Sequence, residues 1–294
     1  MNISITERDI AILLMIYFVS GCAISHIQRR FFSSGETGSS NACYRRVQRL
    51  AADGWIKTTR LPSVTGMGAG HLYVSLDRKG RQLVAEHLGL SRSELQRVRA
   101  IDTPYAATHH FAIVNFRLAL ELACERTGLA TLEEWTPESQ LRIPPIPRVE
   151  DPAAPPGAGR ILIPLIADGE FRLRLADGRQ AAFKVEVDLG TVPRKRLCQR
   201  LRGQLVRGRV DERPILWVVP DEKRQAAITE WAQNEARSLG DPTIIWTTTS
   251  EQINESTILT PIWQIVGGPR MALVPPAAAA FSGSGSIRMA AGGA

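Results

Sequence analysis

The sequence has few cysteines, and none of them falls in a pattern that would bind zinc or cross-link the chain. Cys22, Cys43, Cys124 and Cys198 are scattered, with no Cys-x-x-Cys pair and no closely spaced histidine. Zinc sites and disulfide frameworks require such spacing. We therefore expect free thiols and a cytoplasmic protein, because disulfides persist mainly in oxidising compartments.

The chain also lacks an apolar run long enough to cross a membrane. Ten consecutive apolar residues run from Ile10 to Val19, about half of what a spanning helix needs. Acidic residues, Glu7 and Asp9, precede this run, whereas a secretory signal begins with a cationic segment. The run therefore predicts a buried helix, and we expect no membrane partner.

Two thirds of the chain lack any excess of charge. The whole protein has a net charge of +7, and residues 1–100 contain 14 basic and 7 acidic residues, which already account for +7. Residues 101–294 contain 22 basic and 22 acidic residues. This asymmetry favours a polyanionic partner for the first third alone, with an inert basic surface as the alternative.

The first third has the pattern of three helices, an antiparallel strand pair and a further helix. Thr6 and Asp9 have the spacing of a capping box at the start of the first helix, which the apolar run to Val19 fills. Helices are then predicted over 24–32 and about 40–52, strands over 55–61 and 72–76, and a helix through Leu88. A glycine-rich tip joins the two strands. This order is typical of a winged helix-turn-helix domain.

The third helix has the pattern of a DNA recognition helix. Cys43, Val47 and Leu50 form its apolar face, and the polar side chains point outward. Arginine can contact guanine edges and phosphates, and glutamine can contact adenine. We therefore predict duplex DNA as the partner, with a winged helix that makes only protein contacts as the alternative. The predicted contacts are Ser40, Asn41, Tyr44, Arg45, Arg46, Gln48 and Arg49 on the helix, and Lys57 and Arg60 on the hairpin.

The rest of the chain has the pattern of an α/β domain with a mixed, partly parallel sheet. A helix is predicted over 111–126, followed by a proline-rich loop over 144–156 without regular structure. Strands are predicted over 161–166, 171–175, 181–187, 215–219 and 243–247, with helices over 193–206 and 221–239.

Three carboxylates fall at the ends of these strands. Glu186 and Asp188 share one face of a strand, because side chains alternate along it, and a hairpin can bring Asp168 beside them. Such a cluster could hold Mg²⁺ and a water for phosphodiester cleavage. The alternative is that Asp168 caps a turn while the other two carboxylates form ion pairs with Lys184, Arg194 or Lys195.

The sequence resembles the replication-relaxation proteins of plasmids and integrated mobile elements, from about Thr6 to Thr249. The resemblance rests on the order and spacing of several short motifs. These are Thr6–Asp9, Tyr73–Gly80, His110 with Asn115, Ala167–Gly169, Glu186–Thr191, Trp217–Pro220 and Ile245–Thr248. It implies a winged helix joined to a domain similar to the PD-(D/E)XK nucleases, and a role in replication, relaxation or mobilisation of DNA.

The resemblance also implies which residues would form a nuclease-like site. It places metal-binding carboxylates at Asp168 and Glu186, with Asp188 where such nucleases have a catalytic lysine. Arg200 and Gln204 stand where the family usually has lysine and tyrosine, and Ala167 replaces a proline. An acidic residue in place of the lysine adds repulsion to the developing phosphorane charge, so cleavage is not favoured. On the helix that follows, Arg194, Lys195, Arg196 and Arg202 are predicted DNA contacts.

These patterns together predict an α+β protein with four segments. They are a winged helix-turn-helix domain over 1–90, a connector over 91–106, a nuclease-like domain over 107–268 and a low-complexity tail over 269–294. The favoured function is a DNA-binding accessory or initiator protein of a mobile element with a degenerate nuclease-like domain. The alternatives are a metal-dependent nickase and a winged-helix transcriptional regulator. Other replication, mobilisation or transposition proteins are candidate partners, and a homodimer is one option for the assembly.

Overall fold

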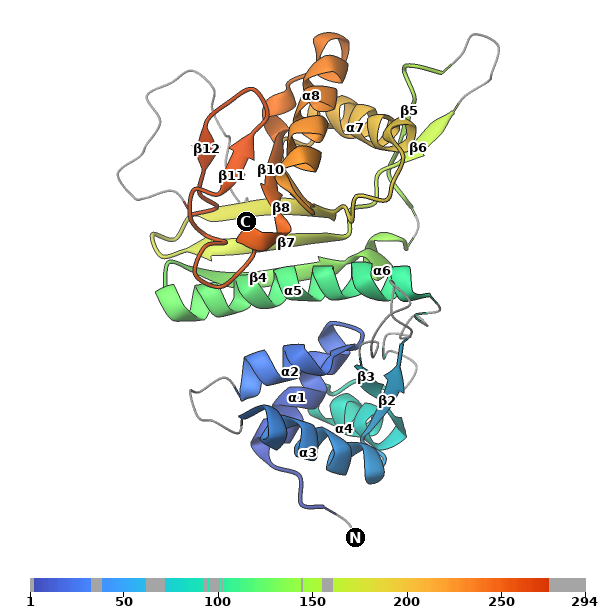
Figure 1. Ribbon diagram of the computed structural model, residues 1–294, viewed down its shortest axis with the longest axis vertical. Coiled ribbons are helices and arrows are strands. Elements are labelled where there is room, and N and C mark those ends of the chain that lie inside the picture. Colours follow the sequence, from blue (N-terminus) through green and yellow to red (C-terminus); the bar gives the residue numbers. More distant parts are fainter. Residues whose placement is uncertain are drawn as a thin grey trace. The chain divides into compact units, whose positions relative to one another are not determined.

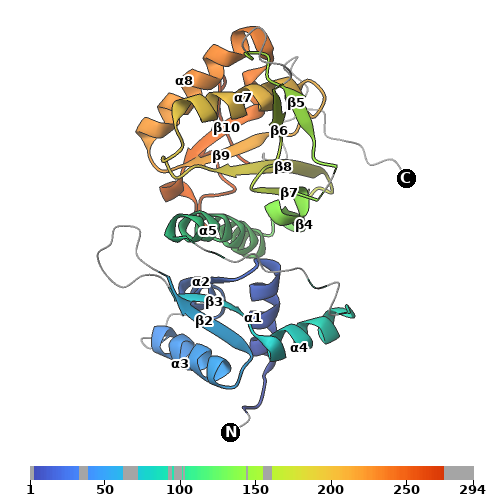
Figure 2. The same cartoon turned by 90° about the vertical axis from the view of Figure 1, so that its right-hand side faces the viewer.

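The computed structural model describes residues 3–32, 39–61, 72–91, 95, 101, 103–143, 145–154 and 161–274. Figures 1 and 2 show these residues as a mixed α+β chain with a large mixed sheet. Eight α-helices lie in this described part. The α+β class predicted from the sequence is confirmed.

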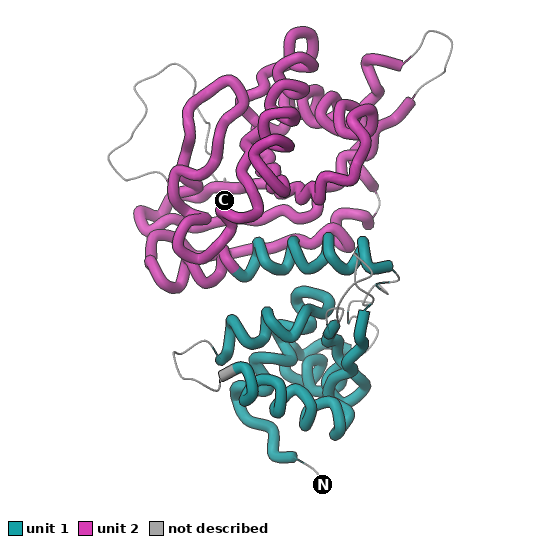
Figure 3. Tube along the Cα trace, in the orientation of Figure 1, with its two compact units in different colours: residues 1–118 teal, residues 119–294 magenta. Residues whose placement is uncertain are grey.

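The chain divides into two compact units, residues 1–118 and 119–294 (Figure 3). The division falls inside one long helix, α5 (Pro104–Thr127), so its two halves belong to different units. The segment limits expected from the sequence placed a boundary at residues 106/107, just after the start of this helix. Most of the predicted connector, the glycine-rich hairpin tip and residues 275–294 of the predicted tail lie outside the described residues.

Unit 1 contains the three helices, the antiparallel strand pair and the fourth helix in the predicted order. They are α1 (Glu7–Phe18), α2 (Ile24–Phe31), α3 (Ser39–Ala52), β2 (Ile56–Arg60), β3 (Leu72–Leu76) and α4 (Arg78–Leu88). A two-residue strand, β1 (Cys22–Ala23), pairs with β3 and completes a three-stranded sheet. The sequence did not predict β1, because two residues are too few to show an alternating pattern.

The core of unit 1 forms from the apolar faces that the sequence predicts. The Thr6 hydroxyl accepts from the Asp9 amide, and the Asp9 carboxylate accepts from the Thr6 amide, so the predicted capping box is present. Ile12, Leu13 and Ile16 of α1 are fully buried. They share one cluster with the inner face of α3, namely Cys43, Val47 and Leu50. The ten-residue apolar run is therefore part of a buried helix, as expected.

The first half of α5 packs against the rest of unit 1 through two of the residues that carried the family resemblance. A ring nitrogen of His110 lies 2.8 Å from the carbonyl oxygen of Gly21, and the Asn115 side chain accepts from Arg29 at 3.3 Å. Gly21 has a φ of +97°, and a Cβ there would lie 2.1 Å from the Tyr73 hydroxyl oxygen. Only glycine fits this position, and the contacts of His110 and Asn115 are structural.

Unit 2 is built on a seven-stranded sheet with the strand order β12-β11-β10-β9-β8-β7-β4. Strands β8, β9 and β10 run parallel to one another, and the remaining neighbours are antiparallel. The strands are β4 (Ala130–Pro137), β7 (Gly169–Leu175), β8 (Gln180–Val187), β9 (Ile215–Val219), β10 (Ile245–Thr249), β11 (Trp263–Ile265) and β12 (Arg270–Met271). The predicted mixed, partly parallel sheet is confirmed.

Helices cover one face of this sheet. Leucines of α7 (Arg194–Gly208) and Ile228 and Ala232 of α8 (Glu222–Leu239) form a buried cluster with Trp217 and its neighbours on β9 and β10. Short elements complete the unit: α6 (Glu138–Leu141) and two 3₁₀ turns, Pro242–Ile244 and Ser250–Gln252. On the strands, a row of aromatic rings runs from Trp135 through Phe171 and Phe183 to Trp246.

Five strands were missed or wrongly placed in the expected pattern. β4 was not predicted, because its sequence mixes polar and apolar residues without strict alternation and contains an irregularity between Leu132 and Glu134. β5 (Arg148–Glu150) lies inside the proline-rich segment expected to have no regular structure. β6 (Leu162–Pro164) pairs only with β5, in a separate two-stranded sheet, and does not join the large sheet as expected. β12 falls inside the segment predicted as a tail, and β11 was also missed.

Candidate functional site

The outer face of α3 presents polar side chains to solvent, opposite its buried apolar face. Tyr44, Arg45, Gln48 and Arg49 are exposed, and the Tyr44 side chain retains 43% of its accessible surface. Neither Arg45 nor Arg49 has an acidic partner among the described residues. An arginine without an internal partner keeps its planar set of donors for an external anion.

Arg46 is the exception on this helix, because its guanidinium binds within the fold. Its Nε donates to Asp9 Oδ1 at 2.7 Å, a terminal nitrogen donates to Asp9 Oδ2, and the same nitrogen donates to the Ser4 carbonyl oxygen at 3.0 Å. Burial opposes ionisation of Asp9, but the hydrogen bonds from Arg46 and Thr6 outweigh it, and the pKa of this carboxyl is lowered. Arg46 therefore holds α3 to the start of α1, a role that the sequence did not predict.

The lowered pKa of Asp9 predicts a pH-dependent contribution to the stability of unit 1. A carboxyl with a lowered folded-state pKa stabilises the fold above its unfolded-state pKa, and this contribution is lost as pH falls through the folded-state pKa. We expect Asp9→Asn to lower the free energy of unfolding by about 1–3 kcal/mol near pH 7. The gap to the wild type should shrink below about pH 4. Thermal unfolding across this pH range measures it.

Glu7→Gln is the matched control for this prediction, because Glu7 lies in the same turn of α1, is exposed and has no hydrogen bond or ion pair among the described residues. It should change the melting temperature little at any pH. A gap between Asp9→Asn and the wild type that stays constant from pH 7 to acid would show that the ion pair is not its source.

The other predicted contacts of unit 1 are on the surface. Ser40 and Asn41 are exposed near the start of α3, and Lys57 and Arg60 are exposed on β2. Arg60 already has a partner within the structure. None of these side chains is buried. The hairpin tip between β2 and β3 lies outside the described residues.

The three predicted carboxylates of unit 2 lie together where β7 begins and β8 ends. Asp168 immediately precedes β7, and its amide donates to the carbonyl oxygen of Val185. Its Oδ2 accepts from the amide of Val187 at 2.7 Å. Asp168, Glu186 and Asp188 retain 7%, 2% and 5% of their accessible surface. The hairpin has therefore brought Asp168 beside the end of β8, as the sequence predicted.

Glu186 of β8 and Asp188 just after it are each bound by a cation from a covering helix. Glu186 Oε2 accepts from Arg200 at 3.0 Å, and its Oε1 accepts from Gln204 at 2.8 Å. Asp188 Oδ2 accepts from Arg224 at 2.6 Å, whereas its Oδ1 is buried without a hydrogen-bond partner in the described structure. Lys184, weighed as a partner of these carboxylates, instead donates to Asp211 at 2.7 Å. Glu186 and Asp188 do form ion pairs, as the alternative interpretation expected, but with Arg200 and Arg224 instead of Lys184, Arg194 or Lys195.

Arg200 is the electrostatic centre of this cluster. Glu186 is the main reason that the pKa of Arg200 is raised, against the opposing effect of burial, and Asp168 and Asp188 add to it. Gln204, which donates to Glu186, also accepts from the indole nitrogen of Trp217 at 3.1 Å. Arg200 and Gln204 thus both bind Glu186.

The donor set does not fit a resident metal ion. In the described parts of the chain, no group of three histidine, cysteine, aspartate or glutamate side chains is arranged to hold one. Both Glu186 oxygens accept from protein donors, and the guanidinium of Arg200 already supplies positive charge among the carboxylates. The adjoining cavity, lined by Lys184 and Glu186 among others, has a volume of about 30 Å³, enough for roughly one or two waters.

The basic helix α7 divides into an exposed and an engaged part. Arg194, Lys195 and Arg196 are exposed at its start, and the Arg194 guanidinium lies 5.5 Å from the centre of the Trp231 ring. Arg202 is 15% exposed and binds Asp151 at 2.9 Å and Glu235 at 3.0 Å. Arg202 is therefore bound inside unit 2, and the first turn of α7 contains the basic side chains that are open to a partner.

The family model described as Replication-relaxation matches residues 13–213 of the chain. The chain belongs to the replication-relaxation family. The match spans both units and includes Asp168, Glu186, Asp188 and Arg200. No curated protein and no solved structure matches the chain. Membership suggests a role in replicating or relaxing the DNA of a plasmid or mobile element. No helix in the described ranges is long and apolar enough to cross a membrane.

Proposed function

We propose that this replication-relaxation protein binds duplex DNA through unit 1, acting as a winged helix-turn-helix domain. In this role it is an accessory or initiator factor for the replication, relaxation or mobilisation of its element. The outer face of α3 is the observation that carries the proposal. It presents Arg45 and Arg49, which have no acidic partner among the described residues, flanked by Tyr44 and Gln48, on a helix whose other face is buried in the core.

The charge distribution supports the same conclusion. All of the net charge of +7 belongs to residues 1–100, which unit 1 contains. Neutralisation of DNA phosphates by basic side chains provides most of the affinity of such proteins and makes it depend on salt. The antiparallel strands β2 and β3, with Lys57 and Arg60 exposed, are in the chain position of a wing, which contacts phosphates beside the recognition helix.

For unit 2 we propose a nuclease-like domain of the PD-(D/E)XK type that does not cleave. Two arginines bind Glu186 and Asp188, and the carboxylate of Asp188 stands where a nuclease of this class has its lysine. Without that lysine, the developing charge on a phosphorane would face a carboxylate. The domain then serves as a scaffold, with Arg194, Lys195 and Arg196 as an additional basic surface.

A metal-dependent nickase is the second candidate, and one observation favours it. The three carboxylates gather at one end of the sheet, and Asp188 Oδ1 is buried without a hydrogen-bond partner among the described residues. Buried polar atoms are usually satisfied, so an unpartnered oxygen in a carboxylate cluster is open to a further ligand.

Incubation of the full-length protein with supercoiled plasmid and Mg²⁺ or Mn²⁺ separates the two proposals. We expect the protein to retard the plasmid on a gel without producing nicked circles, because Arg200 and Arg224 bind the carboxylates. Nicking that requires the metal and is lost in Asp168→Ala would establish the nickase. Failure of the wild type to bind duplex DNA at low salt would remove the proposed function itself.

A further inference from the structure

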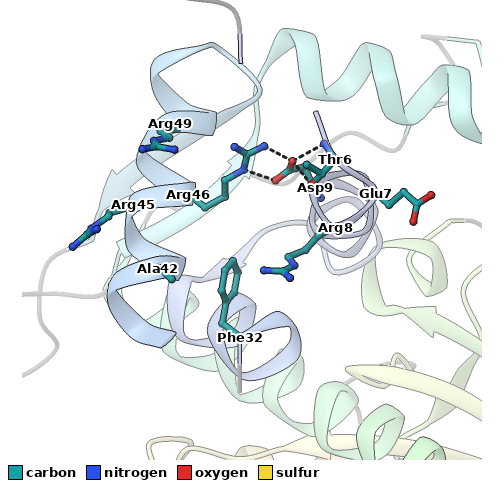
Figure 4. A pocket seen from close by; sticks show the side chains of 9 residues that line it. All are labelled: Thr6, Glu7, Arg8, Asp9, Phe32, Ala42, Arg45, Arg46 and Arg49. Carbon is teal, nitrogen blue, oxygen red and sulfur yellow. Dashed lines mark hydrogen bonds and ion pairs between the residues drawn. The ribbon is translucent and has the colours of Figure 1, made fainter. Parts of the chain in front are cut away.

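Beside α3, unit 1 has an open hollow of about 810 Å³ whose lining is rich in arginine (Figure 4). It lies between the start of α1 and α3. The residues that line it are Thr6, Glu7, Arg8, Asp9, Phe32, Ala42, Arg45, Arg46 and Arg49. Four arginines and two carboxylates give this lining a formal net charge of +2.

Of the two acidic residues of this lining, one is already bound within the fold and the other points away from α3. Asp9 is 1% exposed and is bound by Arg46 and Thr6. The Glu7 side chain points away from α3 (Figure 4). The charges of Asp9 and Arg46 largely cancel, so this ion pair adds little to the electrostatic potential in the hollow. Arg8, Arg45 and Arg49 therefore determine the charge that a ligand would meet.

Arg8 is placed to bind an anion from the α1 side. Its guanidinium carbon lies 5.2 Å from the centre of the Phe32 ring, and Figure 4 shows the two side chains pointing toward each other. An aromatic ring attracts a guanidinium at its face and leaves the planar N–H edge free to donate. Arg8 is exposed and has no acidic partner among the described residues.

We infer that this hollow receives the phosphates of a DNA strand that crosses it, with Arg8 contacting a phosphate from the α1 side while Arg45 and Arg49 reach the base edges from the α3 side. The inference rests on the proposed function and extends it to α1, which the sequence did not assign to the DNA interface. A hollow of 810 Å³ has more room than a single phosphate needs, which suits a passing sugar-phosphate strand. Arg46 is the positioning residue, since its bonds to Asp9 and Ser4 hold α3 against the start of α1.

Titration of a labelled random-sequence duplex over a range of salt concentrations tests the inference with the full-length chain. Arg8→Ala should weaken binding several-fold at low salt and reduce the slope of log K against log salt by about 0.9, the loss of one phosphate contact. The loss should be the same for different duplex sequences, because phosphates carry no sequence information. Arg8→Lys should recover part of the slope.

Arg78→Ala is the matched control, because it removes one exposed arginine from another helix of unit 1, α4. It should leave the affinity and the slope at wild-type values. If the wild type binds the duplex and Arg8→Ala retains its affinity and slope, the phosphate site is wrong while the proposed function stands.

A second measurement decides between DNA and a free anion as the source of the phosphate. The melting temperature is compared in inorganic phosphate and in chloride at equal ionic strength, for the wild type and for Arg8→Ala. Phosphate could stabilise the wild type but not Arg8→Ala, while the wild type does not bind the duplex. That result would support the phosphate site and overturn the proposed function. A wild-type protein that neither binds the duplex nor is stabilised by phosphate would overturn both the phosphate site and the proposed function.

Discussion

Replacing Arg45 and Arg49 by alanine in one variant is expected to weaken binding of a preferred duplex on the order of 100-fold. Both side chains project from the outer face of α3, and neither has an acidic partner among the described residues. A bidentate contact from arginine to guanine is worth about 1–3 kcal/mol, and two such contacts multiply their effects. The measurement is a titration of duplexes enriched from a random pool by the wild-type protein.

The double variant should also lose discrimination between enriched and scrambled duplexes, because base contacts confer specificity whereas phosphate contacts do not. A control with Arg78→Ala and Arg81→Ala removes the same charge from α4 and should change affinity little. Wild-type affinity in the Arg45/Arg49 variant would remove α3 as the recognition helix. An equal loss of affinity for enriched and scrambled duplexes would show that these arginines contact only phosphates.

Removal of Arg200 is expected to destabilise unit 2 by about 2–4 kcal/mol. This is less than the cost of breaking a fully buried ion pair, because solvent screens the exposed part of Arg200. Glu186 would remain buried without its cation, close to Asp168 and Asp188, whereas the Arg200 side chain itself is 43% exposed. For a domain of this size the melting temperature should fall by roughly 5–15 °C. Thermal unfolding of Arg200→Ala at neutral pH measures it.

Two further variants show whether the buried charge is the cause. Arg196→Ala removes an exposed arginine from the same helix and should melt close to the wild type. The double variant Arg200→Ala with Glu186→Gln should be more stable than Arg200→Ala alone, because the neutral amide no longer leaves an unpaired charge inside the unit. A double variant that is less stable than Arg200→Ala would contradict this account of the site.

The elements of unit 1 could be predicted from the sequence because their signals are local. The capping box needs only Thr6 and Asp9 three residues apart, and the inner face of α3 needs only Cys43, Val47 and Leu50 at helical spacing. Two strands, β1 in unit 1 and β4 in unit 2, were missed for a local reason too. β1 has two residues and β4 lacks alternation, so neither has a periodic pattern that a single sequence can show.

The candidate sites were predictable as sets of residues but not as networks of partners. The sequence placed Asp168, Glu186 and Asp188 at one end of a sheet, and the structure does so. It did not pair Asp188 with Arg224, which is 36 residues away and comes from a different helix. Arg202 and Arg46 were expected to contact DNA, although both are bound by aspartates inside the fold.

The sequence by itself determined that this chain is α+β, that its net charge lies in the first hundred residues, and that its motifs are those of the replication-relaxation family. Composition and short-range spacing carry that information. Only the tertiary structure decided which arginines are open to an external anion, because an arginine is free or bound according to the carboxylate that the fold brings to it. Arg46 meets Asp9 and Arg200 meets Glu186, whereas Arg8, Arg45 and Arg49 have no carboxylate partner among the described residues.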